Sequence, residues 1–561
     1  MVLREQALVI YYYVRRNENR MSFNVLNDED SKEKPKVYIE NIIFNDNTVL
    51  ELDSNSIVVF TGANNSGKSQ VLKDIELFVE NRNSSIAKVV RDCNIVLKGS
   101  IIENDFIKEH FYINQEGLYQ VKESTNAFLR NQLIRFWKNS SEFYFIYKLF
   151  IHRLSTDERL TASRALNRAK PQYYNSIIKL YKNEEIAQSI SEYFRQAFEC
   201  DLVVNRNELT DIPLHVGKAP NKTLYTIDKQ DDYYNAVEKL PKLDEQGDGM
   251  KSFATILLDA FTSNYPITLI DEPEAFLHPP QARILGKMFS KNIMSDRQLF
   301  ISTHSEDFLI GLIDSGAENI NVIRIDRDNE INHMSVLQSD KIKTLWGNPI
   351  LRYSNILSGL FHKMVIVCES DYDCLFYQSM ITAMYEKKKE IAPDILFTHC
   401  GGKARIKDIV AALKAVNVKV AAITDFDLLN RSQIFKPLVE AFGIDWNNTI
   451  NKKMQIIYDS MNGKNSKTGD AWTNIKKIGK AGFTDKAPEA YEYVEKDCKA
   501  GGLFIVPVGE MECFDKTINK EKKEWVYHVL ENYDLANEQK LEEARKFLTG
   551  ILEYGFGKCQ Y

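Results

Sequence analysis

Residues 57–69 read IVVFTGANNSGKS and decide the fold of the first half of the chain. The apolar run Ile57–Phe60 predicts a buried strand, and apolar residues recur at helical spacing in SQVLKDIELFVE, residues 69–80. Between them, GANNSGKS (62–69) matches GxxxxGK[ST], whose glycines let backbone N–H groups face a phosphate at the start of a helix. A chance glycine turn is the alternative, but such a turn does not require a strand before it and a helix after it. The stretch therefore predicts a nucleotide-binding loop.

This loop is expected to supply most of the contacts to ATP. Lys68 is expected to reach the β- and γ-phosphates, and the hydroxyl of Ser69 can bind Mg²⁺. The candidate ATP-binding residues of the loop are Gly62, Asn64, Asn65, Ser66, Gly67, Lys68 and Ser69.

A second apolar strand ends in two acids, in ITLIDEPEAFLHP at residues 267–279. Asp271 is expected in the magnesium shell, and Glu272 is placed to polarise the attacking water. The next apolar run, QLFISTHS, brings His304 to a strand end, where it can contact the γ-phosphate. An exposed acidic turn is the alternative, and the phosphate loop upstream makes it the weaker one.

Small residues start a predicted helix in DEQGDGMKSFATILLDAF, residues 244–261, and form an anion-binding turn there. With Gly247 and Gly249 in the key places, this segment resembles a degenerate signature of ABC ATPases, in the branch of SMC-like and overcoming-lysogenisation-defect (OLD) proteins. The resemblance implies a homodimer or higher oligomer, in which the signature of one ATPase head closes over ATP bound to the other. It also implies a magnesium-sensing glutamine, for which Gln115 is the candidate.

The sequence changes character after residue 360. Four further buried strands are predicted, with helical stretches between most of them, at 364–368, 394–398, 418–424 and 503–508. Glu369 follows the first of these strands, and Asp425 and Asp427 follow the third. Carboxylates at such strand ends can converge on one or two Mg²⁺ or Mn²⁺ ions and act on a phosphodiester. Acidic residues also cap helices, and for Asp371 alone that explanation is equally good.

A glutamate followed by DxD resembles the TOPRIM fold of topoisomerases, bacterial primases and OLD nucleases. The segment HCGGKARI (399–406) is similar to the glycine turn between the two motifs, and PVGEMECFD (507–515) to a later acidic motif. The resemblance implies these metal ligands: Glu369, Asp373, Asp425, Asp427 and Glu512, with Glu510 as the alternative to Glu512. It also implies a catalytic lysine, chosen here as Lys546 beside Lys540 and Lys403, although a solvated helix lysine is the more ordinary reading of Lys546.

The order of these motifs is that of the OLD family, which includes the nuclease subunits of Gabija phage-defence systems. The fold class expected is α/β: an ABC-type P-loop ATPase domain with a helical dimerisation insertion, followed by a TOPRIM domain. The expected boundaries are an extension at 1–35, the ATPase at 36–359 with its insertion at about 125–200, and TOPRIM at 360–561.

The resemblance implies an ATP-regulated, metal-dependent endonuclease for nucleic acid, with DNA favoured, in defence against phage. A helicase, or a reverse transcriptase with its DNA product, is the kind of partner implied. The alternative is an SMC-like repair or sensor ATPase that binds DNA and whose TOPRIM domain does not cut.

Composition limits the partners. Net charge is −6, with 44% hydrophobic and 27% charged residues, so any contact to nucleic acid must be a local patch. No run of about 18 apolar residues predicts a membrane span, and eight scattered cysteines without a CxxC pair fit a reducing cytoplasm.

One candidate patch is the insertion at about 451–486, in which lysines could contact phosphates and Trp472 could stack on a base. A solvated loop explains this segment equally well. Its charged residues are Lys452, Lys453, Lys464, Lys467, Lys476, Lys477, Lys480 and Lys486 against Asp459, Asp470 and Asp485. A second basic stretch, Arg153–Lys182, is expected to be a solvated dimer arm.

Overall fold

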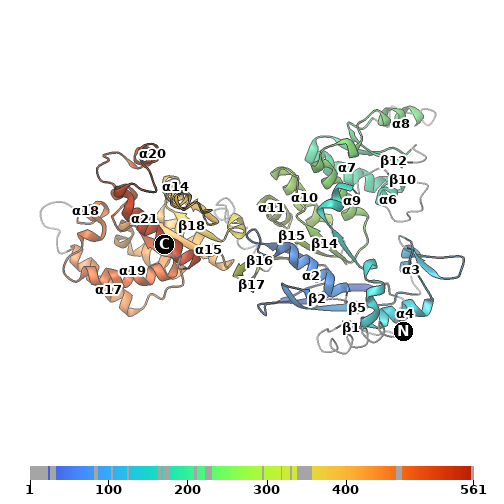
Figure 1. Ribbon diagram of the computed structural model, residues 1–561, viewed down its shortest axis with the longest axis horizontal. Coiled ribbons are helices and arrows are strands. Elements are labelled where there is room, and N and C mark those ends of the chain that lie inside the picture. Colours follow the sequence, from blue (N-terminus) through green and yellow to red (C-terminus); the bar gives the residue numbers. More distant parts are fainter. Residues whose placement is uncertain are drawn as a thin grey trace. The chain divides into compact units, whose positions relative to one another are not determined.

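The structure, a computed structural model, forms two compact units, residues 1–343 and 344–561 (Figure 1). No helix within the described part of the chain is long and apolar enough to cross a bilayer. The residues described are 23–25, 33–80, 86–102, 105–122, 125–161, 166–167, 176–206, 211–220, 230–292, 296–316, 319–328, 331–337, 357–462 and 471–557.

The phosphate-loop strand lies inside a six-stranded sheet of the first unit, with the order β17-β16-β4-β15-β14-β9. Five strands are parallel, and only β17 runs antiparallel to its neighbour β16. Every residue of β4 and β15 is buried, as expected for strands covered on both faces. The bounds are β4 (Ile57–Thr61), β9 (Ile151–Leu154), β14 (Ile267–Asp271), β15 (Gln298–Ser302), β16 (Ile320–Asp328) and β17 (Ile331–Leu337).

Parallel strands bring their carboxyl ends to one edge, and the register shows which residues meet there. Ser302 of β15 pairs with Phe60 of β4 on one side and with Asp271 of β14 on the other. The phosphate loop after Phe60, the acids after Ile270 and the histidine after β15 therefore share this edge.

A second sheet, β1-β5-β2-β3, lies in the same unit, and helix α2 (Lys68–Glu80) packs against β5 of this sheet and against β14 and β15 of the first. Their apolar residues form one continuous core. The strands are β1 (Phe23–Val25), β2 (Lys36–Phe44), β3 (Val49–Glu51) and β5 (Val90–Lys98). The other described α-helices of the unit are α3 (Asp105–His110), α4 (Arg130–Lys138), α5 (Thr156–Thr161), α6 (Ser176–Lys182), α7 (Glu184–Phe198), α8 (Gln230–Glu238), α9 (Asp248–Thr262), α10 (Pro279–Asn292) and α11 (Glu306–Asp314).

The segment expected as a helical insertion, about 125–200, is not helical throughout. Its residues Ile151–Leu154 form β9, which pairs in parallel with β14 in the main sheet. The strand is only four residues long and alternates little, so the helical pattern around it hides it. The solvated arm expected from Arg153 is also wrong in part, because Arg159 is completely buried.

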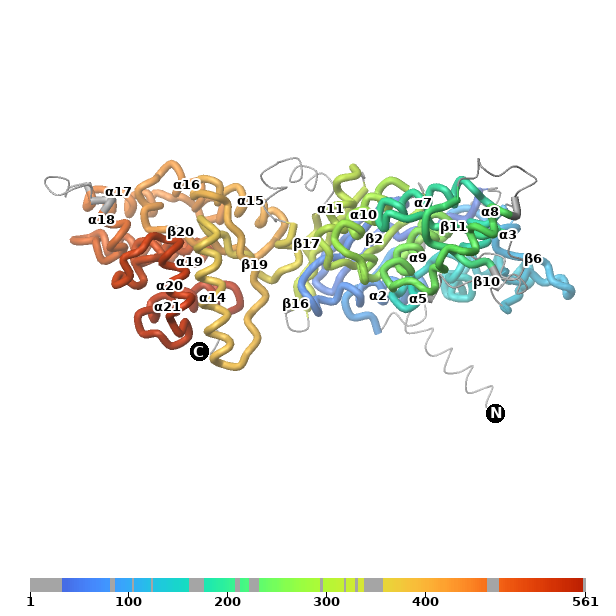
Figure 2. The backbone as a smooth tube through the Cα atoms, turned by 90° about the horizontal axis from the view of Figure 1, so that it is seen from above, coloured from blue at the N-terminus to red at the C-terminus, as the bar shows by residue number. Residues whose placement is uncertain are grey.

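The second unit, drawn in yellow to red in Figure 2, is built on a four-stranded sheet with the order β19-β18-β20-β21, in which all neighbours are parallel. The four strands predicted from the sequence are present, as β18 (Met364–Cys368), β19 (Ile395–His399), β20 (Val420–Thr424) and β21 (Leu503–Ile505). One face packs in a core with α14 (Asp371–Lys388), α20 (Lys522–Asn532) and α21 (Glu542–Phe556). Helix α15 (Ile406–Ala415) packs against β18 and β20, and α19 (Ala487–Gly501) against β21.

The basic insertion at about 451–486 is largely helical, because it contains α17 (Asn448–Asn462) and α18 (Ala471–Ile478). Three of its charged residues, Lys464, Lys467 and Asp470, lie outside the described residues, as does the side chain of Trp472. Most of the extension expected at 1–35 also lies outside them, apart from β1, which pairs with β5.

Candidate active sites

The phosphate loop is held in shape by its glycines and by a neighbouring strand. Gly62 has φ +136°, and a Cβ there would lie 2.3 Å from the carbonyl oxygen of Ile325, so the loop needs glycine at this position. Asn332 of β17 donates its amide to the carbonyl oxygen of Ser66 at 2.6 Å. No local pattern points to Asn332, which lies 266 residues from Ser66 along the chain.

Lys68 folds over this loop and donates to the carbonyl oxygens of Gly62 and Ala63, each at 2.9 Å. Burial lowers the pKa of Lys68, and the acids 271, 272 and 274 partly offset that effect. The Ser69 hydroxyl donates to Asp271 Oδ1 at 2.8 Å. The loop and the acidic strand end are therefore in direct contact, as Mg²⁺ coordination by both would require.

Glu272 and His304 also meet at this edge. His304 Nδ1 lies 3.4 Å from an oxygen of Glu272 and 3.4 Å from an oxygen of Glu274. The backbone of Glu272 is left-handed, with φ +47°, a conformation that costs a non-glycine residue free energy and is found at functional turns. Its N–H donates to the carbonyl oxygen of Ser302 at 2.9 Å, which fixes the turn to β15.

Two further residues of this site were missed by sequence reasoning. Glu274 accepts hydrogen bonds from Thr303 Oγ1 and from the His304 N–H, and burial raises its pKa. Its other oxygen, Oε2, is buried without a hydrogen-bond partner. Arg159, fully buried, donates to the carbonyl oxygen of Glu272 at 2.9 Å. The repeated acid in DEPE was a signal for Glu274, whereas only the fold reveals Arg159.

The remaining nucleotide candidates lie elsewhere. Gln115 occupies the exposed turn between β6 (Phe111–Ile113) and β7 (Tyr119–Val121), in a separate three-stranded sheet, so the structure does not bring it to the phosphate loop. Gly247 and Gly249 lie at the exposed N-terminus of α9. A Cβ on Gly249 would approach the carbonyl oxygen of Phe276 in the same chain to 2.6 Å, whereas one on Gly247 meets nothing within 4 Å.

In the second unit, acidic side chains meet at the carboxyl ends of β18 and β20. The backbone N–H of Asp425 donates to Glu369 Oε1 at 2.9 Å. Lys403 Nζ lies 3.5 Å from Glu369 Oε1 and 3.8 Å from Asp425 Oδ2, and it also contacts Asp427 Oδ1. All four side chains are largely buried, with exposed fractions of 10–14%. Lys403 comes from the CGGK turn, where Gly402 has φ +136° and so requires glycine.

Burial dominates the electrostatics of these acids. It raises the pKa of Glu369 to about 7, with the charge of Asp425 adding to the effect and Lys403 opposing it. The pKa of Asp425 is also raised, again chiefly by burial. Carboxylates kept together out of water at this cost are typical of functional sites and of metal sites.

Asp373 and Glu512 lie beside this group. Asp373 forms a capping box with Ser370 at the start of α14, and it pairs with Lys522 Nζ at 2.7 Å. Although burial opposes it, Asp373 and Asp425 raise the pKa of Lys522. Burial raises the pKa of Glu512, whose Oε2 is buried without a hydrogen-bond partner. Lys522 is a site residue that the sequence did not single out.

The lysine chosen from the sequence is not part of this group. Lys546 is 73% exposed on α21 and pairs with Glu542 one turn away, so Lys403 and Lys522, and not Lys546, are the lysines at the carboxylates. Lys540 pairs with Asp515 at 3.5 Å. Glu510, the alternative to Glu512, pairs with Lys476.

The donor set fits a hard divalent cation, because it consists of carboxylate oxygens, and Oε2 of Glu512 is a buried acceptor still without a partner. Over the described ranges, no three His, Cys, Asp or Glu side chains already surround one point. The ammonium group of Lys403 lies among three of the carboxylates instead. A cation would therefore share or replace the contacts that Lys403 makes.

Comparisons with known proteins match both units. Residues 127–311 match the family described as "AAA domain, putative AbiEii toxin, Type IV TA system". Residues 360–427 match "Overcoming lysogenization defect protein-like, TOPRIM domain", a span that begins just before β18 and ends at Asp427.

Two relatives are OLD nucleases. The chain is 27% identical over 202 residues to the OLD nuclease of Thermus scotoductus, covering 33% of this chain and 36% of that protein. It is 22% identical over 273 residues to the Old nuclease of Escherichia phage P2, covering 46% and 44%. The chain thus spans less than half the length of the curated relatives it matches.

Among solved structures, an Smc head bound to the C-terminal winged-helix domain of ScpA aligns with a TM-score of 0.33 and 12% identity, covering 54% of this chain and 99% of that one. The SMC head domain of Thermotoga maritima aligns with a TM-score of 0.28 and 11% identity, covering 55% and 100%. Scores this low support no further conclusion. The two matched domains, in this order, and the two nuclease relatives support an OLD-family protein in which a P-loop ATPase domain is followed by a C-terminal TOPRIM domain.

Proposed function

We propose that this chain is an ATP-regulated, Mg²⁺-dependent endonuclease that hydrolyses phosphodiester bonds of nucleic acid, with DNA as the favoured substrate. One observation carries the proposal: Glu369, Asp425 and Asp427 meet, buried, at neighbouring strand ends of the TOPRIM sheet. The two OLD nucleases among the relatives support the same activity.

At this site Glu369, Asp425, Asp427 and Glu512 would hold the ion, Mg²⁺ or Mn²⁺. When bound, the ion supplies Lewis-acid stabilisation of charge on the cleaved phosphate. Asp373, held by its capping box and by Lys522, positions the start of α14 beside the carboxylates. Lys522 and Lys403 place positive charge where negative charge grows on a phosphate during hydrolysis. Lys522 is the proposed replacement for Lys546 in this role.

In the ATPase unit, Lys68 would hold the β- and γ-phosphates, while Ser69 and Asp271 would hold the nucleotide's Mg²⁺. Glu272 would polarise the attacking water. His304, whose Nδ1 lies 3.4 Å from Glu272 Oε1, would contact the γ-phosphate and so respond to its presence. Arg159 and the Ser302 carbonyl, which bind the backbone of Glu272, keep its side chain aimed at this edge. ATP would control cleavage through closure of two heads.

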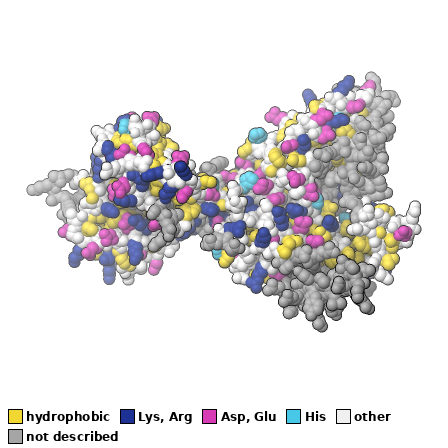
Figure 3. All heavy atoms as spheres, viewed as in Figure 1, with side chains coloured by type: hydrophobic (Ala, Val, Ile, Leu, Met, Phe, Trp, Pro, Cys, Tyr) yellow, Lys and Arg dark blue, Asp and Glu magenta, His cyan; other side chains and the backbone are white. Residues whose placement is uncertain are grey.

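The proposed assembly is a homodimer through the ATPase heads, acting in the cytoplasm in defence against phage. A helicase, or a reverse transcriptase with its DNA product, is the proposed kind of partner. Lys and Arg side chains are mixed with acidic ones on the visible face of the second unit, so contact to nucleic acid would be local (Figure 3).

The test is a matched pair of assays, ATP turnover and metal-dependent nicking of a plasmid, on each variant. Asp425→Ala should lower cleavage by at least about 100-fold, the upper end of what losing a residue that supports a metal site costs. ATP turnover should stay nearly unchanged, because the nucleotide's Mg²⁺ has its own ligands. Asp408→Ala, an exposed aspartate on α15, is the control and should change neither activity.

Two ATPase variants complete the set. Glu272→Gln should keep ATP binding and slow hydrolysis, and Lys68→Ala should weaken ATP binding by about 2–5 kcal/mol, because the phosphates lose their main cation. Lys73→Ala, on the exposed side of the same helix, is its control. If Asp425→Ala cuts as well as wild type in a contaminant-free preparation, the nuclease proposal fails.

A second function has one observation in its favour. Lys403 and Lys522 already neutralise the carboxylates, as they would in a TOPRIM scaffold that binds no ion. The chain would then be a repair or sensor ATPase that clamps DNA. It predicts ATP-dependent DNA binding and no metal-dependent cleavage by the wild type in the same assays.

A further inference from the structure

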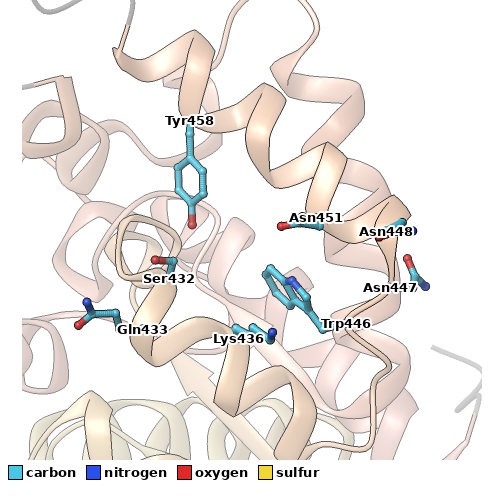
Figure 4. A pocket seen from close by; sticks show the side chains of 8 residues that line it. All are labelled: Ser432, Gln433, Lys436, Trp446, Asn447, Asn448, Asn451 and Tyr458. Carbon is cyan, nitrogen blue, oxygen red and sulfur yellow. The ribbon is translucent and has the colours of Figure 1, made fainter.

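A cavity of about 510 Å³ lies in the second unit between the start of α16 (Ser432–Ala441) and the first half of α17. Trp446, in the connection between these helices, lines one side of it, with Asn451 above the ring and Lys436 next to it (Figure 4). The hydroxyl of Tyr458 points into it from α17. Nothing in the nucleotide or carboxylate sites uses these residues.

Two of the side chains that line the cavity, those of Trp446 and Asn447, are held in place by their neighbours. The ring of Trp446 packs edge-on against Phe435, with centroids 5.6 Å apart and an interplanar angle of 84°, while the residue stays partly exposed. Asn447 Oδ1 accepts from the backbone N–H groups of Thr449 and Ile450 at 2.9 and 3.0 Å. The Asn451 N–H donates to the carbonyl oxygen of Asn447 at 3.0 Å. The ring of Trp446 and the side chain of Asn447 are therefore held in place at the cavity.

The cavity begins one short turn after the carboxylates. Ser432, the first residue of α16, lines it and lies only five positions after Asp427 in the chain. Asp427 lies in a 3-10 turn, Phe426–Asn430, which Arg431 joins to Ser432, so five steps of about 2 Å give a span of about 10 Å. Arg431 also reaches back to Asp427 Oδ2, at 3.8 Å. About three stacked nucleotides, at 3.4 Å each, cover the same distance.

We propose that this cavity binds an unstacked base of a single-stranded nucleic acid whose backbone passes the carboxylates. Every base has a face that can stack on tryptophan, and amide side chains can donate to and accept from base edges. The amides that line the cavity are Gln433, Asn447, Asn448 and Asn451. All four residues are exposed, so their side chains are accessible to a polar ligand.

Positive charge is available for the phosphates next to that base. Lys436 lines the cavity and is half exposed, with only a long 3.9 Å contact to Glu440. Lys452 and Lys453 follow Asn451 on α17, and Lys452 is exposed. This inference rests on the proposed nuclease function for its substrate class, but it assigns a separate site with its own binding step.

The experiment measures binding of a fluorescent single-stranded oligodeoxynucleotide by anisotropy, with EDTA present so that nothing is cut. Trp446→Ala should raise Kd by about 5- to 100-fold, the range that loss of one base–aromatic stack gives. Asn451→Ala should raise it by about 5-fold. Gln455→Ala is the matched control, because Gln455 is an exposed amide on the same helix that bonds Asp459 and does not line the cavity. A blunt duplex should bind all variants equally.

Trp446→Phe keeps a ring against Phe435 and covers the case in which Trp446→Ala fails to fold; it should lose less affinity than the alanine variant. An oligoribonucleotide of the same sequence, run in parallel, separates RNA from DNA. Equal single-strand affinities for wild type, Trp446→Phe and Asn451→Ala would overturn the proposal, even if the wild type cleaves nucleic acid. Trp446-dependent binding by a protein that never cleaves would instead support the cavity and refute the nuclease.

Discussion

Lys403 decides between a TOPRIM site that binds a metal ion and a TOPRIM scaffold that binds none. Its ammonium group contacts the same carboxylates that an ion would need. Removing that competing charge should strengthen ion binding. Two unit charges 4 Å apart interact by about 1–4 kcal/mol between bulk water and a protein surface. Lys403→Met should therefore raise the affinity for Mn²⁺ at this site by at least about tenfold, as measured by calorimetry without nucleotide.

Lys407→Met is the control for that measurement, since Lys407 lies four residues on, half exposed, and pairs with Asp408 away from the carboxylates. Unchanged or weaker Mn²⁺ binding in Lys403→Met would mean that the lysine organises the carboxylates and does not compete with the ion.

Glu369 should make the metal-free protein less stable as pH rises. Its pKa is about 7 in the fold against 4.5 for an ordinary glutamate, because of burial and then the charge of Asp425. The folded state therefore holds more protons between these values. Stability is full below about pH 4.5 and falls until about pH 7, by about 3 kcal/mol. Glu369→Gln cannot ionise, so its unfolding in EDTA should lose most of this slope between pH 5 and 8.

Glu390→Gln, an exposed glutamate after α14, should keep the wild-type slope. An identical pH dependence in Glu369→Gln and wild type would show that this carboxyl is not the group responsible.

At the scale of elements, the buried strands that end at acidic site residues could be predicted from the sequence. The residues that hold those acids in place could not. Continuous apolar runs such as Met364–Cys368 and Ile267–Asp271 are readable as buried parallel strands, and the acid after each strand then follows. The strand Ile151–Leu154 was missed because four residues carry too little pattern. Its neighbour Arg159 was missed because a basic residue in a basic stretch suggests solvent, and only packing behind Glu272 shows otherwise.

The lysines show the same limit. Lys546 lies on a charged helix where sequence alone cannot separate a surface residue from a site residue. Lys522 contacts Asp373, which is 149 residues away in the sequence, and Lys403 contacts Asp427, which is 24 residues away. No local sequence pattern predicts contacts over such separations. Carboxylates were found because strand ends converge by topology; lysines were not, because long side chains arrive from helices and turns.

The strand–loop–helix unit around the phosphate loop should tolerate no side chain at Gly62. A methyl group there would lie 2.3 Å from the Ile325 carbonyl oxygen, and φ is +136°. Gly62→Ala should cost about 1–3 kcal/mol of stability and weaken ATP binding, since the loop must move. Gly550→Ala is the contrasting control: a Cβ there meets nothing within 4 Å in α21, so stability should rise by about 0.5–1 kcal/mol. Urea unfolding and ATP titration of both variants measure this, and wild-type behaviour of Gly62→Ala would contradict the tight contact.

At the scale of the whole molecule, the fold places two groups of candidate site residues on separate sheets, one in each unit. The candidate nucleotide site has its lysine, acids and histidine at one edge of one sheet, and Gly247, at the start of α9, is exposed with open space around it. Such a helix start offers N–H groups and a positive dipole end to a phosphate from another molecule. A shared site between two heads is thus the arrangement that would use it.

Cross-protomer complementation tests that arrangement, and the structure selects the variant to use. Gly249 is unsuitable, because any side chain there strikes the Phe276 carbonyl of its own chain, whereas Gly247 has extended backbone and open space around a Cβ. Gly247→Glu should therefore fold normally and repel the phosphates of a partner's ATP. Alone, Gly247→Glu and Lys68→Ala should each lack ATP turnover. In an equal mixture, half of the dimers are mixed, and each of these has one intact loop facing one intact signature, so turnover should recover to about a quarter of wild type.

The fraction of mixed dimers is checked by differential tagging and native mass spectrometry. If verified mixed dimers stay inactive, or if Gly247→Glu alone turns over ATP normally, the nucleotide site is complete within one chain and the α9 glycines serve only its packing.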